Sequence, residues 1–363
     1  MTKLFIRWFR RNFSDPQAVI LLMLLLAGFT LIYTLSDILA PVFVAIVLAY
    51  LLDWIVQALE RKHVPRKYGV TLVFTGFCTV TLILTLGLVP LIWKQLETLV
   101  VDTPQMLKKV KTTLDTLPNE YPAFVSQEQL VELYQVLGEK MGGLGELVLS
   151  VSFSSLLNVA ALLVYLILVP LMLFFFMKDK HKIVGWGVRW LPKDRYLANR
   201  VWSEVNAQIG NYIRGKVLEI FIVGAVSFIT FSFFGLRYSL LLAVLVGFSV
   251  LIPYIGAAVV TLPVALVAYF QWGFESQFFW LIFAYGIIQA LDGNALVPFL
   301  FSEAVNLHPV AIIIAVLFFG GIWGFWGVFF AIPLATLVKA VISAWDEVKM
   351  TDDDEPSVES GTV

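Results

Sequence analysis

From Val151 to Met177 the chain reads VSFSSLLNVAALLVYLILVPLMLFFFM, and this stretch contains no charged residue. About twenty apolar residues, each with a rise of 1.5 Å along a helix, cross the roughly 30 Å hydrocarbon core of a bilayer. The stretch does not alternate between apolar and polar residues, as the strands of a membrane barrel do. It therefore predicts a membrane-spanning helix. A second uncharged stretch, from Gln17 to Leu35, predicts another span near the N-terminus.

The composition of the whole chain is that of a membrane protein. Of the 363 residues, 60% are hydrophobic and 14% are charged, whereas soluble domains carry roughly a quarter charged residues. The net charge of −1 gives no concentrated basic surface of the kind that binds nucleic acid. We therefore expect an all-α polytopic membrane protein with a lipid bilayer around it and about eight transmembrane helices, some of them broken or short.

Apolar and polar stretches alternate along the chain and predict the order of its segments. The predicted order is a cytoplasmic N-terminus (1–16), spans one to three (17–93), a small helical insertion on the outer side (94–150), span four (151–177), a cytoplasmic connection with an amphipathic helix (178–216), a C-terminal transmembrane bundle with broken helices (217–345) and a disordered acidic tail (346–363).

The distribution of Lys and Arg predicts the orientation, because these residues accumulate on the cytoplasmic side of a membrane. They are frequent in the N-terminal segment and in the loop at 53–67, and the connection at 178–216 holds nine of them against three acidic residues. The insertion at 94–150 holds five lysines against eight acidic residues. We therefore expect a cytoplasmic N-terminus and an insertion on the opposite side.

Motifs for catalysis are absent from the sequence. The three histidines, His63, His181 and His308, have no metal-ligand spacing, and there is no phosphate-binding loop for ATP hydrolysis. The single cysteine, Cys78, cannot form a redox pair within the chain. We therefore expect no enzyme activity, no metal site and no cofactor.

Four polar residues in the apolar second half are candidates for a substrate or ion pathway: Glu219, Gln289, Asp292 and Asn294. An ionisable side chain inside a membrane costs a few kcal/mol or more and usually faces the bundle interior or water. Two interpretations stay open. Glu219 could instead be an interfacial residue paired with Arg214 or Lys216, and the other three could form a loop or a helix cap at the surface.

Proline and glycine interrupt the second half and divide it into segments that are short for a full crossing. Broken helices at membrane depth occur where they are buried in protein or line a wet cavity, so they indicate a transport site. The positions that we expect to break or turn the helices are Pro253, Tyr254, Gly256, Asn294, Pro298, His308, Pro309, Gly324, Gly327 and Pro333.

Four motifs in the same order resemble those of the autoinducer-2 exporter family of permeases. They are NYIRG at 211–215, VLIPYIG at 250–256, NALVP at 294–298 with NLHP at 306–309, and GGIWG at 320–324 followed by Ile332-Pro333. The resemblance extends over nearly the whole chain. Within it, Arg214, Pro253, Gly256, Asn294, Pro298 and Pro333 are motif positions to which it assigns no chemical role.

The resemblance implies a multi-pass protein of the bacterial inner (cytoplasmic) membrane and a homo-oligomer, with a pentamer as one candidate assembly. It also implies transport, of a small signalling furanone in some branches and of sodium or lithium against protons in others. The branch that this chain resembles most supplies no substrate.

Three functional hypotheses follow. The leading one is a secondary permease that exports a small polar solute. The first alternative is a sodium or lithium/proton antiporter in which Glu219 or Asp292 exchanges protons with the ion. The second is a membrane scaffold that transports nothing and presents the insertion at 94–150 to partners in the cell envelope.

Overall fold

The computed structural model of the chain describes residues 16–114, 165–189, 196–301 and 307–340. These residues form helices and turns, without a strand among them. Six helices are long and apolar enough to cross a membrane, and three shorter apolar helices accompany them. The predicted all-α polytopic class is confirmed. The N-terminus, most of the outer insertion, the first half of span four and the acidic tail lie outside the described residues.

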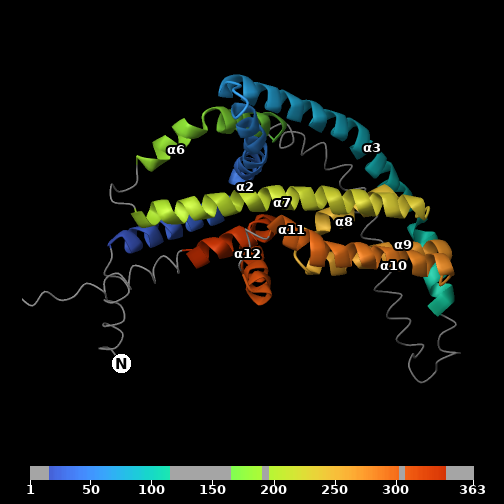
Figure 1. Ribbon diagram of the computed structural model, residues 1–363. Helices are drawn as coiled ribbons and strands as arrows, with labels where there is room; N and C mark the ends of the chain where they lie inside the picture. The colour runs from blue at the N-terminus through green and yellow to red at the C-terminus, as the bar shows by residue number, and fades with distance from the viewer. Residues whose placement is uncertain (1–15, 115–164, 190–195, 302–306, 341–363) are drawn as a thin grey trace, which may run out of the picture.

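Helix α2 (Pro16–Glu60) holds the first two predicted spans in one element. Leu35 has a non-helical backbone (φ −113°, ψ 15°) next to the predicted break at Ser36-Asp37. The two halves of α2 diverge at this point, as the blue ribbon in Figure 1 shows. The polar dipeptide therefore marks a kink, and the chain continues without a loop.

Helix α3 (Arg66–Leu114) continues beyond residue 93, where the sequence analysis ends span three. Lys94 is the first charge after the apolar stretch, but lysine is a good helix former and does not end a helix. The first part of the predicted insertion, residues 94–114, therefore belongs to α3. In Figure 1 this helix arches away from the bundle and returns to it.

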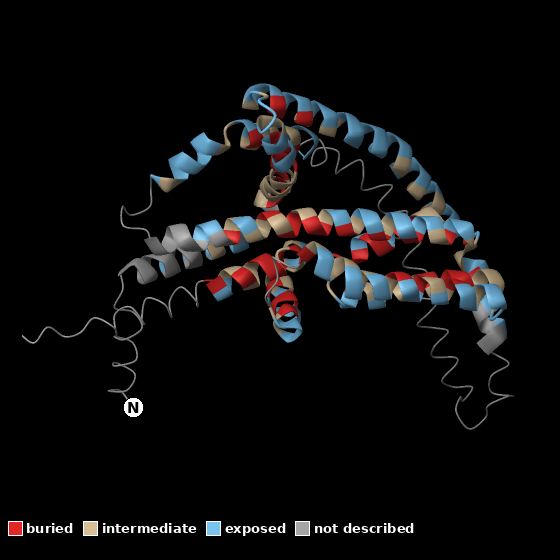
Figure 2. Cartoon of the chain, in the orientation of Figure 1, coloured by how far each residue is buried: buried red, intermediate tan, exposed pale blue. Residues whose placement is uncertain are grey.

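Among the described residues, three apolar clusters are buried, and α3 joins the first to the third. The first cluster packs α2 and the start of α3 against the helix Tyr165–Lys178, with Leu52, Val70 and Leu173 at its centre. The second gathers around Tyr212 and Phe301, and the third reaches Met106 near the far end of α3. Between its ends α3 is largely exposed, as its pale blue middle shows in Figure 2.

Helix α7 (Tyr196–Phe233) follows α6 (Lys180–Val188), and several later helices pack along it. It is continuous, whereas the sequence analysis divides it at residue 216 into a cytoplasmic connection and a span. Figure 1 shows α7 running across the whole width of the fold. Its second half packs closely on α8 (Ser239–Ser249), because a Cβ on Gly247 would lie 2.9 Å from the Ile220 carbonyl oxygen.

Helices α8 and α9 (Ile255–Trp272) form the first hairpin. The chain reverses so tightly that a Cβ on Gly256 would lie 1.7 Å from the Ser249 carbonyl oxygen. At the other end of the hairpin, Gln271 accepts a hydrogen bond from the Arg237 backbone N–H at 2.7 Å and donates one to the Gly235 carbonyl at 2.8 Å. The start of α8 and the end of α9 therefore lie beside the same end of α7.

Three consecutive elements then run back along α7: α10 (Ser276–Leu291), the π-helical segment η1 (Asp292–Leu296) and α11 (Val297–Phe301). The polar sequence Asp292-Gly293-Asn294, which predicts an interruption, widens the helix into a π turn. Such turns are often found at functional positions.

Helix α12 (Pro309–Phe329) and the helix Ala331–Ala340 form the second hairpin. Gly324 has φ 57° and ψ −131°, and a Cβ on Gly327 would lie 1.8 Å from the Phe319 carbonyl oxygen. Glycine is required at both positions, for its backbone freedom at the first and for space at the second.

Two hydrogen bonds join the far end of α3 to the start of α8, at the open end of the first hairpin. The Tyr238 hydroxyl donates a hydrogen bond of 2.6 Å to Asp102, and the Leu241 backbone N–H donates one of 2.9 Å to the Gln95 side chain. Burial, with the Asp102 carboxylate beside it, raises the pKa of Tyr238 to about 12. The phenol therefore remains a hydrogen-bond donor to a higher pH than an exposed tyrosine does.

Candidate functional site

A buried ion pair lies where the first hairpin meets α7. The Lys216 ammonium is 2.8 Å from Glu219 Oε2 and 2.7 Å from the carbonyl oxygen of Val250, which it donates to at the tip of the hairpin. The Lys216 and Glu219 side chains are 4% and 2% exposed. Glu219 is therefore a buried partner of Lys216, and this pairing is part of one of the two interpretations proposed.

Neighbouring residues shape the space around the ammonium. The Phe301 ring lies over it, with 5.3 Å between Nζ and the ring centroid. This ring fits against α7 because residue 215 is glycine, where a Cβ would lie 2.7 Å from the ring. Phe301 also packs on Tyr212, with ring centroids 5.7 Å apart.

Asp292 and Gln289 lie on the helix that faces this pair. The Asp292 carboxylate interacts electrostatically with both Lys216 and Glu219. Asp292 Oδ1 is buried and has no hydrogen-bond partner among the described residues. The structure thus brings Glu219 and Asp292 into one site (the Lys216 site: Lys216, Glu219, Asp292 and the Val250 carbonyl), with Gln289 one helical turn from Asp292.

Asn294 and Arg214 are bound elsewhere. The exposed Asn294 amide donates to the Ala290 carbonyl of its own helix at 2.8 Å. Arg214 donates to the Asn211 side chain at 2.6 Å. Both side chains satisfy polar groups of their own helix, and neither contacts the Lys216 site in the structure.

The predicted helix-break positions serve the two hairpins and the start of α12. Pro253, Tyr254 and Gly256 form the first tip, where Tyr254 has a positive φ of 63°. His308 caps α12, since its Nδ1 accepts from the Val310 N–H, and Pro309 follows as the first helical residue. Pro333 is buried behind the second tip, formed by Gly324 and Gly327, and Pro298 is exposed in α11.

Both hairpins contact α7 within one helical turn. The first reaches Lys216 through the Val250 carbonyl. The second reaches Tyr212, whose ring centroid is 6.3 Å from that of Phe329. Because residues four apart lie on the same face of a helix, the two broken elements converge on one side of α7.

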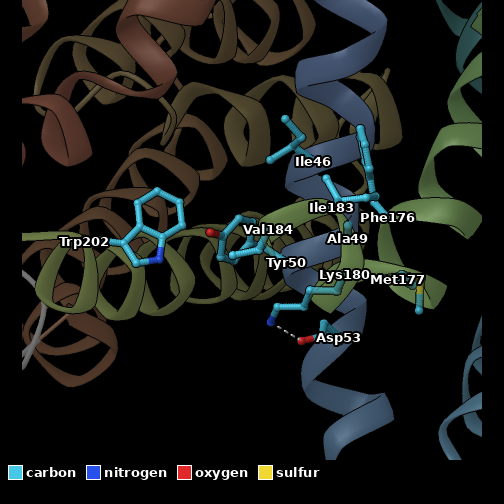
Figure 3. A pocket seen from close by; sticks show the side chains of 10 residues that line it. All are labelled: Ile46, Ala49, Tyr50, Asp53, Phe176, Met177, Lys180, Ile183, Val184 and Trp202. Carbon is cyan, nitrogen blue, oxygen red and sulfur yellow. Dashed lines mark hydrogen bonds and ion pairs between the residues drawn. The ribbon is translucent and has the colours of Figure 1, made fainter. Parts of the chain in front are cut away.

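A second charged cluster lies at the end of the α2–α3 hairpin. Asp53, with its side chain 8% exposed, is 2.8 Å from both Arg66 and Lys180, and it accepts a hydrogen bond from Gln57 at 2.7 Å. Arg66 also donates to the Met177 carbonyl at 2.8 Å. Figure 3 shows Asp53 and Lys180 at one side of an apolar pocket of about 240 Å³ that extends to Trp202.

Lys216 was named from the sequence only as one of two partners for an interfacial Glu219 and as the boundary of a span. Asp53 was not selected, because span two was predicted to end at residue 52. A signal for Lys216 was present, because residues three apart on a helix face each other and Glu219 is at that spacing. No sequence pattern could have indicated the Val250 carbonyl as a partner of Lys216, since every residue has a backbone carbonyl. Within the described residues no group of three His, Cys, Asp or Glu side chains gathers to hold a metal ion.

Comparisons with known proteins agree with a transporter. The protein family described as "AI-2E family transporter" matches residues 19–347. The Escherichia coli (strain K12) protein named "Putative permease PerM" is 50% identical over 348 residues, which cover 96% of this chain and 98% of that protein. The Bacillus subtilis (strain 168) protein named "Putative transport protein YueF" is 25% identical over 311 residues, covering 84% of each chain.

Proposed function

The chain belongs to the AI-2E family of membrane transporters, and on this premise we propose that it is a permease that exports a small polar solute across the bacterial inner membrane. One observation carries the proposal. The buried Lys216–Glu219 pair, with Asp292 beside it, lies at the tip of a broken helical hairpin.

Burial of these charges inside apolar helices argues for a role in transport. Candidate spans enclose all three residues, in Val205–Phe233 and Ser276–Phe301. Ionisable groups at membrane depth are costly, and they usually line the route of an ion or solute. The hairpin tip adds the Val250 carbonyl, which reaches the ammonium because the helix is broken there.

The polar groups of the Lys216 site suit a small polar solute. Lys216 is a hydrogen-bond donor, and Glu219 and Asp292 are acceptors. Asp292 Oδ1 lacks a hydrogen-bond partner among the described residues, so it can bind a solute without losing an existing hydrogen bond. The excess of Lys and Arg at 178–216 supports a cytoplasmic start for α7.

Metabolite profiling tests the proposal. Cells that lack the protein, cells that carry it and cells that carry Asp292→Asn are compared for solutes inside and outside. We expect at least one polar metabolite to leave the cells only when the intact protein is present. Glu275→Gln is the matched control, because Glu275 is an exposed carboxylate at the start of α10. Export that survives both Asp292→Asn and Glu219→Gln would exclude the Lys216 site as the route.

A second candidate function, sodium or lithium/proton antiport, is supported by the charge balance of the site. Two carboxylates, Glu219 and Asp292, share one ammonium. The surplus negative charge can be balanced by a metal cation or by a proton, and exchange between these two is the reaction of an antiporter.

Proteoliposomes with a trapped pH-sensitive dye separate the two candidates. Addition of sodium or lithium chloride moves protons if the protein is an antiporter, and Asp292→Asn abolishes this movement while Glu275→Gln preserves it. The absence of proton movement on adding either salt excludes the antiporter. If metabolite export is also absent, the scaffold hypothesis takes precedence.

A further inference from the structure

The Lys216 ammonium has the kinds of contact that a protein makes with a bound ammonium ligand. It contacts a carboxylate (Glu219, 2.8 Å), a backbone carbonyl (Val250, 2.7 Å) and the face of an aromatic ring (Phe301, 5.3 Å to the centroid). Carboxylates and carbonyls accept from an ammonium, and aromatic faces attract cations. These three kinds of group together form a recognition site for a primary ammonium.

Two of the three groups come from outside the helix that carries Lys216. Val250 is the residue after the last turn of α8, where backbone carbonyls lack partners within the helix and carry partial negative charge. Phe301 comes from α11 and is seated against Gly215. The tertiary fold therefore assembles the site, and a Lys–Glu pair within α7 alone would not require either contact.

The site holds two carboxyl groups, Glu219 and Asp292, for one ammonium. Asp292 interacts electrostatically with Lys216 and Glu219, and its Oδ1 is buried without a hydrogen-bond partner among the described residues. A second cation can therefore bind beside the Lys216 ammonium. Alternatively, a solute cation can replace the Lys216 ammonium, so that the carboxylates keep a positive partner.

We propose that Lys216 is a tethered occupant of a cation site, and that the solute carries a primary ammonium group that takes its place. This inference rests on the proposed transport function for the identity of the solute, but the binding site itself does not depend on it. Because Lys216 bonds the Val250 carbonyl, its displacement also releases the hairpin tip from α7. Entry of the solute is thereby coupled to movement of the first hairpin.

Chemical rescue tests the proposal. Lys216→Ala removes the side chain beyond Cβ, and n-propylammonium has the same three carbons and ammonium as the part removed. Thermal unfolding of the purified full-length variant in detergent is measured with n-propylammonium and with tetramethylammonium, which carries the same charge but no N–H donor. We expect n-propylammonium to raise the Tm of Lys216→Ala by about 3 °C, and to raise that of the parent protein by less, because there it must displace Lys216.

Lys182→Ala is the matched control, because Lys182 pairs with Asp179 at the same spacing but its side chain is 86% exposed. We expect neither ammonium to change the Tm of this variant. If Lys216→Ala is not recovered folded, its yield is measured when it is prepared with each ammonium present. A yield restored by n-propylammonium alone supports the proposal.

Equal effects of the two ammonium ions, or no effect of either on both Tm and yield, would overturn it. Such a result leaves the export assay untouched. If Asp292→Asn still abolishes export, the permease function stands and only the ammonium site is wrong.

Discussion

At the residue scale, the Lys216–Glu219 pair shows how a charge inside an apolar helix depends on its partner. Each group has left water, and its loss of hydration is offset by the other group, the Val250 carbonyl and the nearby ring. Removal of one member of a buried pair leaves an uncompensated charge, whereas removal of both can be nearly neutral. The pair is therefore expected to behave as a unit.

A double-mutant cycle checks this dependence. We expect Lys216→Met alone to lower the free energy of unfolding by about 3–5 kcal/mol, because Glu219 then stays buried without a cation. Lys216→Met combined with Glu219→Gln is expected to recover most of that loss. The measurement is denaturant unfolding of the purified protein in detergent. Additive losses in the double variant would contradict a coupled pair.

Asp53 is the other residue on which several contacts converge. Asp53→Asn removes the charge that holds Arg66 and Lys180, and we expect a loss of about 2–3 kcal/mol in the free energy of unfolding. Lys182→Ala breaks an exposed pair with Asp179 and should change it by less than about 0.5 kcal/mol. Comparable losses in the two variants, measured in the same detergent, would show that burial of Asp53 contributes nothing.

At the scale of the elements, the first hairpin follows from the length of α8 and from one glycine. Eleven residues in α8 rise about 16 Å, which is roughly half of the hydrocarbon core. The tip therefore lies beside Lys216, partway along the candidate span Val205–Phe233. Gln271 brings α9 back to Gly235, at the end of α7 where α8 began. The reversal at the tip depends on the space that Gly256 leaves for the Ser249 carbonyl.

Gly256→Ala tests the tight reversal. The added Cβ would lie 1.7 Å from the Ser249 carbonyl oxygen, so the tip must open, and we expect a loss of about 3 kcal/mol or more. Gly286→Ala is the control, because nothing lies within 4 Å of a Cβ at that position of α10. In a helix interior this change should stabilise by roughly 0.5–1 kcal/mol. Thermal unfolding of Gly256→Ala that matches the parent protein would refute the close contact.

At the scale of the whole molecule, α3 has a large apolar surface that the described residues leave uncovered. The span Arg66–Met106 is 41 residues long, and only 6% of its most apolar window is buried. Its two ends pack on separate clusters, and its middle arches between them (Figure 2). Lipid, another copy of the chain or residues outside the described ranges must cover this arch, because it cannot face water.

We expect neighbouring copies to cover part of it. Native mass spectrometry of the full-length protein released from a mild detergent should show a homo-oligomer as the main species, since the arch offers a long apolar face for helix packing. A monomer as the only species over a range of detergent concentrations would contradict this prediction and leave the arch to lipid.

The sequence by itself determined the class of this protein, because uncharged stretches such as Gln17 to Leu35 can be stable only as helices in hydrocarbon. It also selected Glu219 and Asp292, since charges in such surroundings are rare. Only the tertiary structure decided which breaks reverse the chain, and that Asn294 hydrogen-bonds its own helix while Lys216 reaches the Val250 carbonyl. Those outcomes depend on backbone groups and on contacts between distant helices, which no local pattern of side chains encodes.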